Sequence, residues 1–206
     1  KNYNVHVIAD YAKGVLTPSL IKHLIKLAKK AKIPVIVDPQ GNNYKPYKGV
    51  DIVTPNRKEL SLATGMPANN DKQIRLAANK LISDHNIKSI LATRSGDGMT
   101  LVDSNSFHTY KAEAQEIFDV SGAGDTVVAT ISASLSAGID LKQAVQLANI
   151  SAGIVVAKTG TAVAYANDII EALEKRKLYN EEIKILSTKS AIARAKIWRS
   201  QNFKIG

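Results

Sequence analysis

Residues 117–129 read Ile-Phe-Asp-Val-Ser-Gly-Ala-Gly-Asp-Thr-Val-Val-Ala and place a glycine turn directly before an apolar run that continues to Leu135. The run is typical of a buried helix, so the turn would lie at the amino end of that helix. Backbone N–H groups lack partners there, and the helix dipole is positive. Glycines also let a ligand approach the backbone closely. We therefore expect an anion site formed by the N–H groups of Gly122, Ala123 and Gly124.

The carboxylate of Asp125 follows this anion site and suits the transfer of a phosphoryl group to a hydroxyl. The N–H groups would stabilise charge on the moving phosphoryl, and the carboxylate would orient the hydroxyl and accept its proton. The alternative is that Asp125 merely caps a helix after a glycine turn. A dinucleotide-binding fingerprint fits less well, because its third glycine would fall at Val127. The sequence contains no P-loop motif G-x-x-x-x-G-K-[ST].

The composition predicts one well-buried globular domain with a short appendage, since the chain has 206 residues of which 45% are hydrophobic. It has no charge-free apolar stretch of about 18 residues, so we expect no membrane span. It has no targeting pattern either. The absence of cysteine excludes a disulfide scaffold and a thiolate metal site, and fits a cytoplasmic protein.

The net charge of +10 raises the question of nucleic-acid binding. Residues 174–206 hold 9 Lys and Arg against 3 acidic residues, whereas residues 1–173 hold 19 against 15. The excess therefore lies mostly in the tail. Because no basic stripe interleaved with aromatic residues is present, we expect no nucleic-acid partner.

Strands and helices alternate along the chain in the order typical of a parallel sheet. Asp10, Asp38 and Asn56 each follow a predicted strand, and ligands collect at the carboxyl ends of parallel strands. We therefore expect one working edge of the sheet. The chain begins on a core strand without an initiator Met, which favours a fragment of a longer protein. Strands are expected at 4–9, 34–38, 50–54 and 89–93, an antiparallel pair at 99–102 and 107–111, and helices at 18–32, 56–65, 71–85, 123–135, 141–158 and 169–177.

Two further stretches allow both a structural and a functional interpretation. Asn56 and Glu59 have the spacing of a capping box, and they could equally hold a hydrated Mg²⁺ against nucleotide phosphates. Thr93 and the glycine turn ending at Gly98 could close a hairpin or present backbone to phosphate. In the helix expected at 141–158, Ala148, Ala152 and Gly153 would leave a flat surface for an adenine, or would serve close helix packing.

These motifs, taken in order, resemble the carboxyl-terminal half of ribokinase-like (PfkB-type) carbohydrate kinases. The set is Asn56-x-x-Glu59, Thr93 with its glycine turn, Asp119-Val-Ser-Gly-Ala-Gly-Asp-Thr126 and Ala148-Asn-x-x-Ala-Gly153. Within the family, residues 9–16, 54–60 and 152–161 look like the kinase domain of bifunctional heptose-7-phosphate kinase and heptose-1-phosphate adenylyltransferase. The resemblance covers roughly residues 3–173, and residues 183–206 are similar to the lead-in of the adenylyltransferase domain.

The resemblance implies an α/β fold, a three-layer α/β/α sandwich with a mostly parallel sheet whose amino-terminal part is missing. Residues 1–178 would be the nucleotide-binding part of the kinase domain, and residues 179–206 a linker and lead-in. Asp125 would be the base, with the N–H groups of Gly122, Ala123 and Gly124 as the anion hole. ATP would lie against Asn56, Arg57, Lys58, Glu59, Thr93, Gly98, Asn149 and Gly153, with Mg²⁺ held through water by Asn56 and Glu59.

The implied activity is ATP-dependent phosphorylation of heptose 7-phosphate, for lipopolysaccharide core synthesis, in an enzyme that forms a homodimer at full length. Other ribokinase-like kinases, for fructose phosphates or ribose, remain alternatives, as does a nucleotide-binding module without catalysis. Two positions depart from the family pattern. Ser95 stands where the family has glycine two residues after the threonine, and Gln40 stands where many relatives have lysine. We expect this chain alone to bind nucleotide but to transfer phosphate poorly or not at all.

Overall fold

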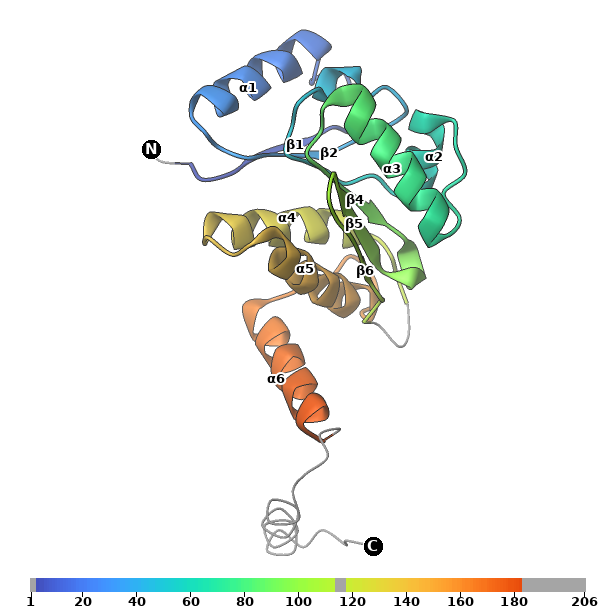
Figure 1. Ribbon diagram of the computed structural model, residues 1–206. Coiled ribbons are helices and arrows are strands. Elements are labelled where there is room, and N and C mark those ends of the chain that lie inside the picture. The colour runs from blue at the N-terminus through green and yellow to red at the C-terminus, as the bar shows by residue number, and fades with distance from the viewer. Residues whose placement is uncertain (1–2, 114–117, 183–206) are drawn as a thin grey trace, which may run out of the picture. The chain divides into compact units, whose positions relative to one another are not determined.

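A six-stranded sheet forms the centre of residues 1–165 (Figure 1). The computed structural model describes residues 3–113 and 118–182, with side chains through residue 176. The strands lie side by side in chain order. The first four are parallel to one another, the fifth is antiparallel to the fourth, and the sixth is antiparallel to the fifth. They are β1 (His6–Ala9), β2 (Val35–Asp38), β3 (Ile52–Val53), β4 (Ser89–Thr93), β5 (Met99–Asp103) and β6 (Phe107–Tyr110).

Helices cover both faces of this sheet (Figure 1). Because successive strand residues point to opposite faces, Val35 and Val37 of β2 join one buried cluster and Ile36 joins the other. The first cluster contains Ile21 of α1, and the second contains Ile131 of α4. This confirms the predicted three-layer sandwich. One layer holds α1 (Pro18–Lys30), α2 (Arg57–Thr64) and α3 (Asp71–His85); the other holds α4 (Ala123–Ser136) and α5 (Leu141–Val156).

Local capping signals explain where the helices begin. The Thr17 side chain accepts the N–H of Leu20 at the start of α1, and Pro18 occupies the first turn. The side chain of Asp140 caps α5 in the same way. Two short 3-10 helices, η1 (Lys45–Tyr47) and η2 (Ser95–Asp97), were not predicted. No helix in the described part of the chain is both long and apolar enough to cross a membrane.

A second unit spans residues 166–206. It contains α6 (Ala166–Glu182), which begins before and ends after the helix expected at 169–177. The predicted boundary after residue 178 falls within α6 and stays a prediction. Most of the predicted lead-in at 179–206 lies outside the described residues, so that assignment stays a prediction.

Candidate functional site

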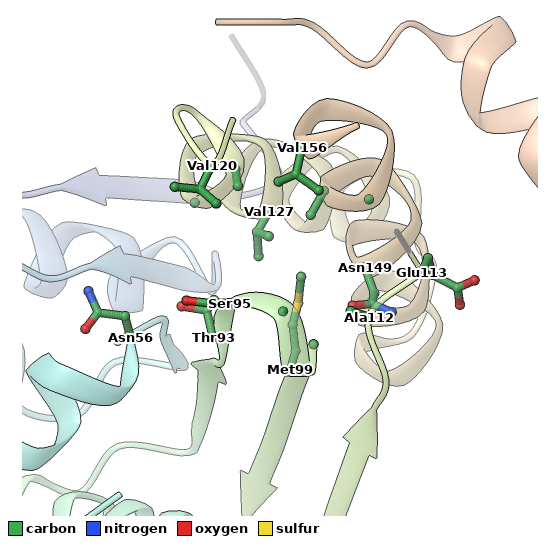
Figure 2. Close-up of a pocket in the computed structure, with 16 residues that line it drawn as sticks. Asn56, Thr93, Ser95, Met99, Ala112, Glu113, Val120, Val127, Asn149 and Val156 are labelled. Carbon is green, nitrogen blue, oxygen red and sulfur yellow. The ribbon is translucent and has the colours of Figure 1, made fainter. Parts of the chain in front are cut away.

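A cavity of about 280 Å³ opens between the end of the sheet and helices α4 and α5 (Figure 2). Val120, Val127 and Val156 line it from the helical side, while Asn56, Thr93 and Ser95 lie opposite them. Met99 stands between the two sides, and Asn149 closes one end beside Ala112 and Glu113. An apolar cavity with a few polar groups at its margins has the character of a small-molecule site.

A second, more polar cavity of about 150 Å³ continues from the first. The two share Asn56, Thr93, Gly124 and Val127 in their walls. The second adds side chains from the carboxyl ends of neighbouring strands, which confirms that one edge of the sheet gathers the predicted polar residues. These additional residues are Asp10, Tyr11, Asp38, Pro39, Gln40, Thr54 and Glu59.

Backbone pairing places Asn56 and Thr93 next to each other. Thr93, the last residue of β4, donates its N–H to the carbonyl of Pro55 at 2.9 Å and forms a parallel bridge with Asn56, which lies beyond the end of β3. The capping box predicted at Asn56 is confirmed. Its side chain accepts the N–H of Glu59 at 3.0 Å, and Glu59 Oε2 accepts the N–H of Asn56 at 2.9 Å. Capping does not exclude a ligand role, because both residues also line the polar cavity.

The polar cavity concentrates negative charge. Burial raises the pKa of the Asp38 carboxyl above its ordinary value; the hydrogen bond from Thr54 Oγ1, at 2.9 Å, opposes this and the charge of Asp125 adds to it. Burial likewise raises the pKa of Glu59, against the hydrogen bonds from Asn56 and with a contribution from Asp38. Grouped carboxylates with raised pKa values favour the arrival of a cation.

The amino end of α4 differs in one detail from the predicted anion site. Gly122, at the N-cap, has φ 77°, and its carbonyl accepts both the N–H and the hydroxyl of Thr126. The N–H of Ala123, however, donates to the carbonyl of Val120 at 3.2 Å, because the left-handed glycine closes a tight turn. The expectation of three unpaired N–H groups is therefore wrong for Ala123. Gly124 lines both cavities.

The Asp125 carboxylate lies in the first turn of α4 and is exposed. Its Oδ1 accepts a hydrogen bond from the phenol of Tyr11 at 2.9 Å. Tyr11 lines the polar cavity, as does Gly124 beside Asp125. Asp125 itself is not among the described residues that line either cavity, but its side-chain partner Tyr11 and its neighbour Gly124 both line the polar one.

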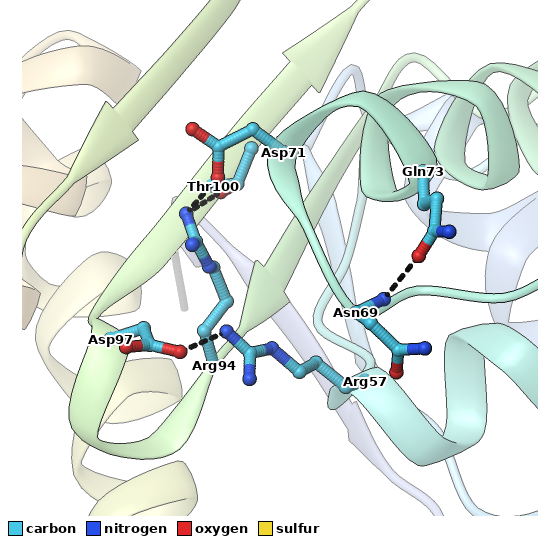
Figure 3. Close-up of polar contacts among 7 residues, drawn as sticks. All are labelled: Arg57, Asn69, Asp71, Gln73, Arg94, Asp97 and Thr100. Atoms are coloured by element: carbon cyan, nitrogen blue, oxygen red, sulfur yellow. Dashed lines mark hydrogen bonds and ion pairs between the residues drawn. The ribbon is translucent and has the colours of Figure 1, made fainter.

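The turn between β4 and β5 is held by ion pairs on its outer side (Figure 3). Arg57, at the start of α2, pairs with Asp97 of η2. Arg94 donates to Thr100 Oγ1 at 3.1 Å and pairs with Asp71 at 2.7 Å. These contacts tie the turn to α2 and α3.

The backbone of this turn has positive φ angles at both Ser95 and Gly98. Ser95 has φ 52°, so it occupies the left-handed conformation that favours the glycine of the family pattern. Gly98 has φ 89°, and a Cβ there would lie 2.0 Å from the carbonyl oxygen of Tyr110. Glycine is therefore required at position 98, where β6 passes close to the turn.

The remaining predicted site residues fall into two groups. Asn149 and Gly153 line the apolar cavity, and Asn149 Nδ2 also donates to the carbonyl of Lys111 at 2.6 Å. As far as the described residues define the cavities, Gly122, Arg57 and Lys58 line neither one. Their predicted contacts with ligand stay predictions.

Several residues that line the cavities were not predicted as site residues from the sequence. Tyr11 and Thr54 line the polar cavity without having been singled out as site residues, and Asp38 was expected only as one of three residues that follow a strand. Their position after predicted parallel strands was the available clue. In the apolar lining of the first cavity, Val120, Val127 and Val156 lie in stretches quoted from the sequence, and Ala152 was expected at an adenine surface, whereas Met99 and Ala112 belong to no quoted motif.

Comparison with known proteins agrees with this geometry. A family model described as pfkB family carbohydrate kinase matches residues 1–168. "Bifunctional protein HldE" of Paramagnetospirillum magneticum is 48% identical over 203 residues, which are 98% of this chain and 42% of that protein. The protein of the same name from Rhodospirillum rubrum is 43% identical over 97% of this chain and 40% of its own length. This chain therefore spans about two fifths of these relatives.

Solved structures share the fold at lower sequence identity. Arabidopsis thaliana ribokinase complexed with ribose and ATP superposes with a TM-score of 0.74 at 23% identity, over 83% of this chain and 56% of that one. Phosphofructokinase-2 from Escherichia coli in complex with potassium gives 0.74 at 21% identity, over 84% and 58%. These similarities show that this chain has the ribokinase-like fold.

Proposed function

Because this chain belongs to the pfkB family of carbohydrate kinases, we propose that it is the nucleotide-binding part of an ATP-dependent heptose-7-phosphate kinase. The reaction would place a phosphoryl group on the anomeric hydroxyl of D-glycero-D-manno-heptose 7-phosphate, in ADP-heptose synthesis for lipopolysaccharide core. The choice of sugar rests on the resemblance of residues 9–16, 54–60 and 152–161. The 48% identity to the Paramagnetospirillum protein over 98% of this chain supports it.

The observation that carries the proposal is the continuity of the two cavities. The apolar cavity offers Met99, Val127 and Val156 to a flat base, with the Asn149 amide at one end. The polar cavity begins where Asn56, Thr93 and Gly124 are shared, and its carboxylates suit phosphates that bind together with a cation. A nucleotide bound this way would lie with its base between sheet and helices and its phosphates toward Asp125.

Mg²⁺ fits the polar cavity as an ion held mainly through water. No group of three or more His, Cys, Asp or Glu side chains among residues 3–113 and 118–176 is arranged to enclose a metal. Mg²⁺ keeps several waters and binds through one or two carboxylates plus substrate phosphates, which matches Glu59 with Asn56. When bound, the ion would screen the negative charge of the phosphates.

Asp125 would act as the base in this reaction. Its carboxylate would accept the proton of the sugar hydroxyl while the hydroxyl oxygen bonds to the terminal phosphorus of ATP and the bond to the departing ADP oxygen breaks. The backbone at Gly124 would stabilise the charge on the moving phosphoryl. The carboxylate would thus take the proton, and the amino end of α4 would stabilise the phosphoryl group during its transfer.

The proposal is tested by binding and transfer measured separately. Calorimetric titration with ATP should show binding that depends on Mg²⁺, and Asp125→Asn should keep that affinity. Single-turnover transfer from radiolabelled ATP is measured in the full-length protein of which this chain is proposed to be the nucleotide-binding part, and heptose 7-phosphate should be the preferred acceptor over fructose 6-phosphate and ribose. Asp125→Asn should lower the transfer rate by about 1,000-fold.

Other results would point elsewhere. Preference for ribose or fructose 6-phosphate would assign a different ribokinase-like activity. Binding of ATP with transfer that Asp125→Asn leaves unchanged would remove the base assignment. A folded chain that binds no ATP would overturn the proposal.

A further inference from the structure

Tyr11 makes a contact that the proposed chemistry does not itself require. It follows β1 and lines the polar cavity, and its phenol donates to Asp125 Oδ1 at 2.9 Å. The two residues are 114 positions apart in the sequence, so the contact depends on how β1 and α4 are placed. More than half of the Tyr11 side chain is exposed, which means that packing does not force it into this orientation.

Hydrogen bonds to the Asp10 carboxylate hold the loop that carries Tyr11. Tyr47, only 2% exposed, donates its phenol hydrogen to Asp10 Oδ2 at 2.6 Å. The other oxygen of Asp10 accepts the N–H of Ala12 at 2.9 Å. Ala12 has φ 52°, a left-handed conformation that costs free energy for a residue with a Cβ. The Asp10 carboxylate therefore holds the residues on both sides of Tyr11 in a defined turn.

We propose that Tyr11 is a positioning residue for Asp125, and that Tyr47 and Asp10 hold it in place. The phenol occupies Oδ1 and so fixes the rotation of the carboxylate, leaving Oδ2 to accept the proton of the acceptor hydroxyl. Placement of a reacting group within a fraction of an ångström governs its efficiency. This role rests on the proposed function, since it takes Asp125 as the base.

The charge state of Tyr11 suits this role. The hydrogen bond to Asp125 raises the pKa of the phenol above its ordinary value, with the Asp125 charge, burial and Asp38 acting in the same direction. The phenol therefore stays protonated and remains a donor at neutral pH. Its titration also gives a direct readout of the contact.

The first test needs no catalysis. In the chain labelled with ¹³C at the tyrosine ζ carbon, the signal lost in Tyr11→Phe identifies Tyr11. Its titration midpoint should fall toward the ordinary value in Asp125→Ala, and should also fall, by less, in Tyr47→Phe. Tyr3→Phe, which changes another exposed tyrosine, should leave it unmoved. An unchanged midpoint in Asp125→Ala would overturn the contact, and an unchanged midpoint in Tyr47→Phe would overturn the anchor.

The second test asks whether the contact matters for transfer. In the full-length protein, Tyr11→Phe should slow single-turnover phosphoryl transfer by about 10-fold while leaving the Kd for ATP unchanged. Loss of ATP affinity in parallel with rate would show a structural role and overturn the proposal, as would an unchanged rate. If Asp125→Ala moves the Tyr11 titration but Asp125→Asn does not slow transfer, the contact stands and the proposed function fails.

Discussion

Two helices begin at the same pair of cavities, and their amino ends are built in opposite ways. At α2, Asn56 and Glu59 cap each other's backbone, so the end is satisfied by its own side chains. At α4, the N-cap is Gly122, which has no side chain to offer. Gly124 in the first turn of α4 lines both cavities, whereas at α2 the capping residues are exposed to them, Asn56 in both cavities and Glu59 in the polar one.

The difference indicates that the two helix ends suit different kinds of ligand. A capped helix end presents fixed side-chain oxygens, which suit a cation and its water. An uncapped glycine end presents backbone, which suits the close approach of an anion. Under the proposed function, phosphate and its counterion would need both kinds of partner, and the two helix ends would supply one each.

The two glycines of the α4 turn should respond to alanine in opposite directions. Gly122→Ala should destabilise the fold by about 1–2 kcal/mol, because alanine is strained at φ 77°. Gly124→Ala meets no atom within 4 Å and should stabilise the helix by about 0.5 kcal/mol. It should nevertheless weaken ATP binding, because its methyl group enters the wall shared by both cavities.

Urea unfolding and ATP calorimetry on both variants separate these effects. Gly65→Ala is a matched control for backbone strain, since Gly65 has φ 67° with open space around it and lies at the far end of α2. It should lose stability like Gly122→Ala and keep ATP affinity. A Gly124→Ala variant that binds ATP normally would argue against backbone contact at this end.

At the capped end, the chain offers a close internal comparison. Asn56 caps α2 and Asn70 caps α3, each accepting an N–H at 3.0 Å through its side chain. Replacing either with alanine should cost about 1 kcal/mol of stability. Only Asn56→Ala should weaken ATP binding and its dependence on Mg²⁺. If calorimetry showed an equal loss of ATP affinity in both variants, the Asn56 side chain would act only as a helix cap.

Features governed by nearby residues could be predicted from the sequence. The capping box at Asn56 and the full extent of α3 follow from local signals, and the sandwich follows from the order of strands and helices. The shared edge of the sheet also follows, because parallel strands align their carboxyl ends.

Contacts between distant segments could not be predicted. The Tyr11 to Asp125 and Tyr47 to Asp10 hydrogen bonds depend on tertiary placement and leave no periodic signal. The engaged N–H of Ala123 depends on the left-handed backbone of Gly122, which composition does not specify. Ser95 shows the converse, since it adopts a glycine-like conformation without being glycine.

The smallest expected effect concerns the Asp38 carboxyl group in the polar cavity. Because burial raises the pKa of Asp38, the folded chain binds this proton more tightly than the unfolded chain does. Stability therefore falls as pH rises from the ordinary value of 3.8 through the raised folded value. Asp38→Asn removes the ionisation while its side-chain oxygen can still accept from Thr54. It should be more stable than the parent at pH 7, with the advantage shrinking toward pH 4.

Asp84 provides the opposite case on the surface of α3. The hydrogen bond from Lys80, at 2.7 Å, lowers the pKa of the Asp84 carboxyl, so its contribution is present above the ordinary value and is lost as pH falls. Asp84→Asn should thus lose a little stability at pH 7, where Asp38→Asn gains it. Urea unfolding of both variants between pH 4 and pH 8 measures the two signs directly. If Asp38→Asn were also less stable at pH 7, the carboxylate would be stabilising the fold, and the polar cavity would hold its charge without needing a cation.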